Sequence, residues 1–280
     1  REDPKSYQRD LDAMPHPQVD ANPDGEGTVE TYTVMHDRSG PKMGIVIMHG
    51  KGGSPDRLVN TLAEGLAQKG YLVANLEMPW SGRREYDATV AAAEAEVTAA
   101  LARLRSAGAT RLFVAGHSQG GVFGLHYAGK YPLDGLVIMA PGGNVSTPFY
   151  QGKIGASVSR ARDLAGAGKG DQRGEFEDFE GGRGTSPVKT TAAIYLTWFD
   201  PDGAMNQMKS SRALPASLPV LYVAPTSDYP ALMRSKQEMF NALPDHPLKR
   251  LYEPVTDHRG APAASLEEVA RWTTEVAARR

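Results

Sequence analysis

The chain has 280 residues, a formal net charge of −2 and 40% hydrophobic residues, enough for one large core in a single domain or in a domain with an insertion. The small charge argues against nucleic acid or a membrane surface as an electrostatic partner, and the absence of cysteine excludes disulfides, thiol catalysis and cysteine-ligated metals. No apolar run approaches the roughly 18 residues that a membrane span needs.

Residues 1–27 are polar and rich in Pro, Asp and Asn, so we expect an N-terminal arm that carries no targeting signature. The sequence starts at Arg1 rather than Met, which fits either a trimmed chain or a mature product. A cysteine-free chain with a polar leading arm favours a periplasmic or secreted location over a cytoplasmic one.

Residues 28–143 alternate between strand and helix patterns. Continuous apolar runs such as IVIM are typical of strands buried on both faces, and apolar residues at helical spacing followed by Gly indicate helices. In chain order, the pattern predicts strand Thr28–Met35, strand Ile45–Met48, helix Leu58–Lys69, strand Tyr71–Leu76, helix Glu85–Ala107, strand Leu112–Ala115, helix Gln119–Lys130 and strand Leu136–Met139.

Residues 144–216 have a different composition, with many Gly and Ser residues and two charged blocks. Lys153–Arg173 is net basic, and Glu175–Glu180 (EFEDFE) is acidic. We interpret these residues as a solvated surface insertion, with helices predicted at Val158–Ala167 and Val188–Trp198.

The alternation of strands and helices resumes in residues 217–280. The predicted elements are strand Pro219–Ala224, helix Ala231–Leu243, strand Leu248–Tyr252 and helix Leu266–Ala278. The whole pattern predicts an α/β fold with a doubly wound, mostly parallel β-sheet flanked by helices, formed by residues 28–143 and 217–280. Ligands bind at the carboxyl ends of such strands, where the loops after Met48, Ala115, Ala224 and Tyr252 meet.

Ser118 lies in one of these loops, in the sequence GHSQGG at 116–121. It follows a predicted strand and precedes a predicted helix, the context of a nucleophile on a sharp turn. Gly116 and Gly120 supply the small flanks that such a turn needs. The alternative is a structural or phosphate-binding turn, because short motifs also arise by chance.

A serine nucleophile needs a base, and the base needs a carboxylate that orients it. His258 is the histidine in the loop after a late strand, and Asp228 ends the loop after the preceding strand. The chain order Ser118, Asp228, His258 fits a catalytic triad. The alternative carboxylates are Asp200, Asp202 and Asp257.

Acyl transfer also needs two donors for the oxyanion. We predict the main-chain N–H of Gln119, just after the nucleophile, and that of Lys51 in HGKGG at 49–53, with Gly52 in reserve. The glycines of that loop allow close approach of the substrate to the backbone. A plain glycine-rich turn is the alternative interpretation.

With these motifs, residues 28–280 resemble the α/β-hydrolase superfamily, in particular its serine esterase, lipase and dienelactone-hydrolase-like branches. The resemblance rests on HGKGG, GHSQGG, the strand that leads to Asp228 and the Asp-His pair at 257–258. It implies that residues 144–216 are the lid or cap. A dehalogenase would carry Asp at position 118, so that branch is disfavoured.

The hypothesis is a serine hydrolase that cleaves a small carboxylic ester through an acyl-enzyme, without cofactor or metal; the oligomeric state stays open. A thioesterase, or an amidase or peptidase, would use the same triad. A non-catalytic binding protein on this fold is the alternative of another class. Aromatic and sulfur-containing side chains are candidates for the substrate pocket, with packing of the cap on the body as the alternative: Trp80, Tyr195, Trp198, Phe199 and Met205.

Overall fold

A six-stranded parallel sheet forms the centre of the computed structural model, which describes residues 42–279. In spatial order the strands are β2 (Leu72–Leu76), β1 (Met43–Met48), β3 (Arg111–His117), β4 (Gly135–Met139), β7 (Val220–Val223) and β8 (Arg250–Tyr252). Every neighbouring pair is parallel, as the apolar runs predicted.

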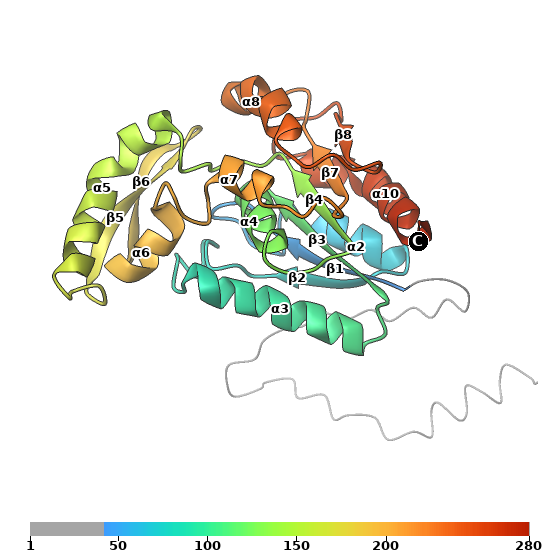
Figure 1. Cartoon of the computed structure of the whole chain (residues 1–280), viewed down its shortest axis with the longest axis horizontal. Helices are drawn as coiled ribbons and strands as arrows, with labels where there is room; N and C mark the ends of the chain where they lie inside the picture. Colours follow the sequence, from blue (N-terminus) through green and yellow to red (C-terminus); the bar gives the residue numbers. More distant parts are fainter. Residues whose placement is uncertain (1–41, 280) are drawn as a thin grey trace, which may run out of the picture. The chain divides into compact units, whose positions relative to one another are not determined.

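The sheet is covered by helices on both faces, so the predicted fold class is confirmed (Figure 1). Successive residues of β1 point to opposite faces: Ile45 and Ile47 pack into one apolar cluster, and Val46 and Met48 into the other. One face carries α2 (Asn60–Gln68), α9 (Ala261–Ala264) and α10 (Leu266–Ala278); the other carries α3 (Val90–Ser106), α4 (Gln119–Ala128), α7 (Gln207–Arg212) and α8 (Pro230–Asn241).

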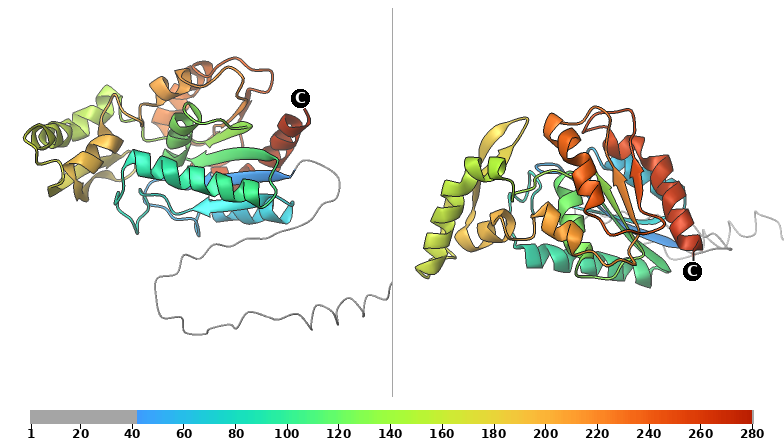
Figure 2. Two further views of the ribbon diagram at one scale, coloured as in Figure 1. Left: turned by 60° about the horizontal axis from the view of Figure 1, so that its bottom comes forward. Right: turned by 45° about the horizontal axis from the view of Figure 1, so that its top comes forward.

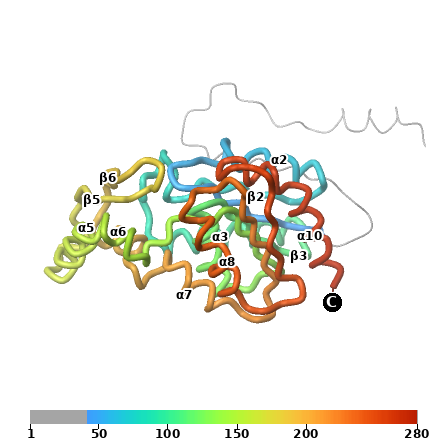
Figure 3. Tube along the Cα trace, turned by 90° about the horizontal axis from the view of Figure 1, so that it is seen from above, coloured from blue at the N-terminus to red at the C-terminus, as the bar shows by residue number. Residues whose placement is uncertain are grey.

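The remaining elements lie between β4 and β7 in the chain. They are α5 (Pro148–Gly166), an antiparallel hairpin of β5 (Arg173–Glu180) and β6 (Gly184–Thr191), and α6 (Ala192–Phe199). Figures 1 and 2 show them gathered beyond one end of the strands of the helix-covered sheet, and the view in Figure 3 places them far from α10.

Several boundaries predicted from the sequence are wrong. The predicted helix 188–198 is strand to Thr191 and helix only after it, because the Thr191 side chain caps the amide of Ile194. The predicted helix 158–167 begins ten residues earlier, at Pro148, and the helix predicted from Glu85 begins at Val90, because Glu85 has a positive φ of 47° and Thr89 caps the first turn. The predicted strand 28–35 and the polar arm 1–27 lie outside the described residues.

The acidic run 175–180 is solvated on one face only. It forms β5, in which Phe176 and Asp178 share the buried face while the glutamates at 175 and 177 point outward. The run therefore alternates between buried and exposed residues, as a strand does, but its buried residues are an aromatic and a carboxylate rather than two apolar side chains. The sequence does not show that Lys51 lies next to this strand, so it gives no reason to place the Asp178 carboxylate on the buried face.

Candidate functional site

Ser118 is the single residue that connects the end of β3 to the start of α4, and it has φ 52° and ψ −117°. This is a strained conformation for a residue with a side chain, of the kind that concentrates at functional sites. The turn is tight: a Cβ at Gly116 would lie 2.1 Å from the carbonyl oxygen of Gly120, and one at Gly120 would lie 2.7 Å from that of His49. Both glycines are therefore required to form this turn.

A further loop, which follows β4, approaches Ser118. Here Ala140 has φ 46°, and a Cβ at Gly142 would lie 3.5 Å from Ser118 Oγ and 3.3 Å from Leu232. The sequence interpretation brought four loops together and missed this one. Its signal was the APGG run directly after a buried strand, in the position that the other loops occupy after theirs.

Asp228 and His258 meet because the loops after β7 and β8 continue the parallel pairing. The amide of Ser227 donates to the carbonyl of Thr256 at 3.0 Å. Asp228 Oδ1 then accepts from His258 Nδ1 at 2.7 Å and from the amide of Tyr229 at 2.7 Å. The two side chains are 4% and 12% exposed, so the pair is largely shielded from water.

The three rival carboxylates have other partners or positions. Asp257 accepts from the amide of Gly260 and Asp200 pairs with Arg162, while Asp202 follows Asp200 in the insertion. Within residues 42–279, no hydrogen bond joins Ser118 Oγ to the ring of His258. The structure therefore brings the predicted base and carboxylate together, and the contact between serine and base stays a prediction; catalytic hydrogen bonds often tighten only with substrate.

The side chain of His117 binds the main chain of the loop that carries His258. Its Nε2–H donates to the main-chain carbonyl of His258 at 2.9 Å, and the two rings lie 4.9 Å apart. Its Nδ1 is buried and has no partner in the described part of the chain. Burial, reinforced by the nearby His258, lowers the pKa of His117 to about 3, so the side chain is neutral near pH 7.

The HGKGG loop is held by hydrogen bonds around His49. The amide of Met78 donates to His49 Nε2 at 3.1 Å, so Nδ1 carries the proton and donates to the carbonyl of Gly50 at 2.7 Å. Burial lowers the pKa of His49, which keeps it neutral. Trp80 Nε1 donates to the His49 carbonyl at 2.9 Å and fixes the same loop from the other side.

The predicted oxyanion donors differ in their availability. The amide of Gly52, the reserve, already donates to the carbonyl of Trp80 at 2.9 Å. In residues 42–279, the main-chain N–H groups of Lys51 and Gln119 have no hydrogen-bond partner. This favours Lys51 over Gly52, and the role of both donors stays a prediction.

The five predicted pocket residues are all buried, at 2% exposure or less. Trp198 packs against Trp80 with ring centroids 5.5 Å apart, Tyr195 stacks on Phe199 at 4.4 Å, and Met205 lies in the same apolar cluster. They pack the insertion onto the sheet. Contact with substrate stays a prediction.

The turn of the β5–β6 hairpin lies between two of the site's loops. A Cβ at Gly182 would lie 3.5 Å from the hydroxyl of Tyr229, and one at Gly52 would lie 3.8 Å from the guanidinium of Arg183. Tyr229 also packs against the ring of His258 at 4.7 Å. The hairpin therefore spans from the proposed oxyanion loop to Tyr229, the residue beside Asp228.

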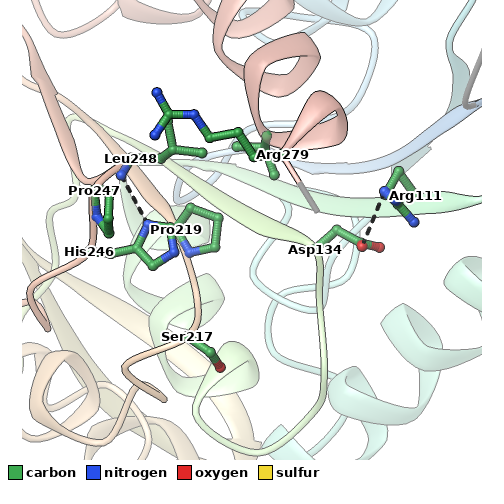
Figure 4. A pocket seen from close by; sticks show the side chains of 9 residues that line it. Arg111, Asp134, Ser217, Pro219, His246, Pro247, Leu248 and Arg279 are labelled. Atoms are coloured by element: carbon green, nitrogen blue, oxygen red, sulfur yellow. Dashed lines mark hydrogen bonds and ion pairs between the residues drawn. The ribbon is translucent and has the colours of Figure 1, made fainter.

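A cavity of about 260 Å³ lies at the other end of the sheet (Figure 4). Arg111, which begins β3, and Asp134, just before β4, line it together with His246 and Arg279. Ser118 follows the opposite end of β3, so this cavity is separate from the site. Within residues 42–279, no group of three or more His, Asp or Glu side chains is arranged to hold a metal ion.

No helix among residues 42–279 is both long and apolar enough to cross a membrane.

A family model described as "Serine aminopeptidase, S33" matches residues 39–179, half of the chain. A second model, "Thiolase-like protein type 1 additional C-terminal domain", matches the shorter range 6–64. Comparison with curated proteins finds no match.

Solved structures share the fold at low sequence identity. One comes from a study of LipS and LipT, two metagenome-derived lipolytic enzymes. It is 20% identical to this chain with a TM-score of 0.57, and the match covers 88% of this chain and 96% of that one. The ferulic acid complex of Est1E from Butyrivibrio proteoclasticus is 15% identical with a TM-score of 0.59, over 89% and 95%. A monoacylglycerol lipase from Paleococcus ferrophilus is 19% identical with a TM-score of 0.52, over 84% and 95%.

Proposed function

The chain belongs to the α/β-hydrolase superfamily, and on that premise we propose that it is a serine hydrolase that cleaves a carboxylic ester through an acyl-enzyme. The observation that carries the proposal is the 2.7 Å pair of Asp228 and His258, held in paired loops beside a strained Ser118. Such strain is retained where the surrounding structure imposes it, and here glycine contacts on both sides of the turn do so.

The protons are placed to suit this chemistry. Because His258 Nδ1–H donates to Asp228, Nε2 carries the lone pair that a general base needs. In the proposed reaction Ser118 Oγ attacks the acyl carbon, and His258 takes the hydroxyl proton and returns it to the leaving alcohol. Water activated by His258 then attacks the acyl carbon and releases Ser118 with the carboxylic acid.

The charge that develops on the carbonyl oxygen needs donors already in place. We assign this role to the unengaged amides of Lys51 and Gln119, since the amide of Gly52 is bound to Trp80. Gln119 is the first residue of α4, so the positive end of the helix dipole adds to the stabilisation. In this scheme no step needs a cofactor or a metal ion.

The residues around the loops suit an apolar acyl or aryl group. Tyr229 and Met233 are each 40% exposed and Phe149 is 67% exposed, so their apolar surfaces are accessible to a ligand. Tyr229 lies beside Gly182 of the hairpin turn, and the ring of Phe149 packs against Phe179 of β5 at 5.5 Å. We propose that residues 144–216 form a cap on the core 42–143 and 217–279, and that small esters with an apolar group are the substrates.

Labelling with a fluorophosphonate, followed by peptide mass spectrometry, tests the proposal. We expect an adduct on the peptide that contains Ser118 in the wild type and none in Ser118→Ala. Ser235→Ala is the matched control, because that serine bonds only within α8. With p-nitrophenyl esters, Ser118→Ala is expected to lose on the order of 10⁴-fold or more in kcat. A folded protein that is never labelled would instead support a non-catalytic binding protein.

A peptidase or amidase is the second candidate, favoured by the description of the matching family as a serine aminopeptidase. The same groups would serve, with His258 protonating a leaving amine. Comparing kcat/KM for an ester, a thioester and an anilide of one acyl group decides between them. Hydrolysis of the anilide that matches or exceeds that of the ester would replace the esterase proposal.

A further inference from the structure

A buried polar cluster joins the β5–β6 hairpin to both of the loops that carry the proposed oxyanion donors. We call it the Asp178 cluster, and its members are Lys51, Tyr86, Gln119, Tyr150 and Asp178. The mechanism above uses the backbone amides of two of these residues and none of the five side chains. The cluster therefore needs an explanation of its own.

The Lys51 ammonium group is held in one orientation. Its Nζ donates to Asp178 Oδ1 at 2.7 Å, to the hydroxyl of Tyr150 at 2.9 Å and to the carbonyl of Phe179 at 3.0 Å. These bonds use all three ammonium protons. Because all three acceptors belong to the insertion, the side chain of a residue in the HGKGG loop is bound entirely by the insertion.

Asp178 is the centre of the cluster, and its side chain is only 4% exposed. Besides Lys51, its Oδ1 accepts from the hydroxyl of Tyr150 at 2.6 Å and from the amide of Phe179 at 2.6 Å. A buried carboxylate needs a partner charge and filled hydrogen-bond positions, and Lys51 with these donors supplies both. Burial raises the pKa of Tyr150, which keeps that hydroxyl protonated as a donor.

The second arm of the cluster reaches the nucleophile's neighbour. The hydroxyl of Tyr86 lies 3.3 Å from Asp178 Oδ2 and 3.1 Å from Gln119 Oε1. Tyr86 itself has a φ of 59°, and its carbonyl accepts from Thr190 of β6 at 2.8 Å. Gln119 is 3% exposed, so its side chain has little freedom to find another partner.

We propose that Asp178 is a positioning residue that couples closure of the hairpin over the site to the geometry of the oxyanion hole. With the hairpin closed, the carboxylate holds Lys51 directly, and the single proton of the Tyr86 hydroxyl is shared between Asp178 Oδ2 and Gln119 Oε1. In this arrangement the adjacent main-chain amides are held ready for the oxyanion. When the hairpin lifts, Lys51 loses all three acceptors at once, and its loop is then held only by the bonds of its main chain and of His49. The catalytic part of this inference rests on the proposed function.

The test compares Asp178→Asn with the wild type under steady-state kinetics, with active sites titrated by fluorophosphonate. An interaction made only in the transition state lowers kcat with little change in KM. We expect kcat to fall about 10- to 100-fold, less than for removal of an oxyanion donor, and KM to change less than about threefold. Asp200→Asn is the matched control: it breaks an ion pair with Arg162 inside the insertion and is expected to stay within about twofold.

Two further variants separate positioning from folding. Lys51→Met is expected to reproduce the loss in kcat, and the double variant with Asp178→Asn to be no worse than either single one, because the pair acts as a unit. Tyr150→Phe removes one donor and leaves the ion pair, so it serves if Asp178→Asn does not fold. The positioning role would be overturned if the loss in kcat across the variants simply paralleled their loss in melting temperature. Additive losses in the double variant would also overturn it.

Hydrogen exchange reads the coupling without any activity. We expect the amides of 49–53 and of the hairpin 173–191 to exchange faster in Asp178→Asn than in the wild type or Asp200→Asn. If the wild type hydrolyses no ester but this pattern appears, the proposed function fails and the coupling stands. If Ser118→Ala abolishes hydrolysis but neither kcat nor exchange responds to Asp178→Asn, the function stands and the coupling is wrong.

Discussion

The stability of the protein is expected to depend on pH through His117. This side chain is 2% exposed, and it donates to the carbonyl of His258 while its Nδ1 has no partner among the described residues. A proton added to Nδ1 would therefore be a buried charge without an acceptor. The ring centroid of His117 also lies 4.9 Å from that of His258. Replacing His117 by Gln keeps an N–H donor in a similar place and removes the titration.

The direction in which stability changes with pH follows from the pKa of His117 in the folded and in the unfolded protein. The pKa of His117 is about 3 in the folded protein, against an ordinary value of 6.5. Between them the unfolded chain binds a proton that the folded protein does not, so the free energy of unfolding rises with pH over this window and is level above it. The whole shift corresponds to at most about 5 kcal/mol, and lowering the pH from about 7 to about 5 removes about 2 kcal/mol of it.

Urea unfolding of the wild type and His117→Gln at about pH 7 and about pH 5 measures this contribution. His49 and His126, whose pKa values burial also lowers, add slopes of the same sign to both proteins, so the difference between the proteins isolates His117. We expect that difference to change by about 2 kcal/mol between the two pH values. A difference that is equal at both would refute the assignment of a neutral, unpartnered imidazole.

Two further substitutions probe the turn and the pair. Gly116→Ala places a Cβ 2.1 Å from the Gly120 carbonyl oxygen, so we expect a lower melting temperature and a loss of labelling by fluorophosphonate; normal labelling would contradict the tight turn. Asp228→Asn keeps the volume, and its oxygen can stay on the amide of Tyr229 while the charge beside His258 is lost. We expect kcat to fall about 10²–10⁴-fold with the fold intact, and a change below about threefold would remove Asp228 from the proposed triad.

Much of the sheet followed from local pattern. The apolar runs around Ile45, Val114 and Ile138 are buried on both faces, and their burial needs no partner of particular chemistry. The turn at Ser118 was partly local, because Gly116 is required by the nearby carbonyl of Gly120, whereas Gly120 is required by the main chain of His49. The starts of two helices did not follow from the pattern, since Thr89 and Thr191 act as caps only in one backbone conformation.

What only the tertiary structure decided was which distant polar groups meet. Chain order made Asp228 and His258 candidates, and the pairing of their loops beyond the ends of β7 and β8 decided that Asp228, rather than one of its three rivals, faces the ring. Asp178 is buried because Lys51, 127 residues earlier in the chain, reaches it. Burial of apolar side chains is favourable against almost any neighbour, whereas a buried charge is tolerated only beside its own partner, so patterns alone predicted the core and not the cluster.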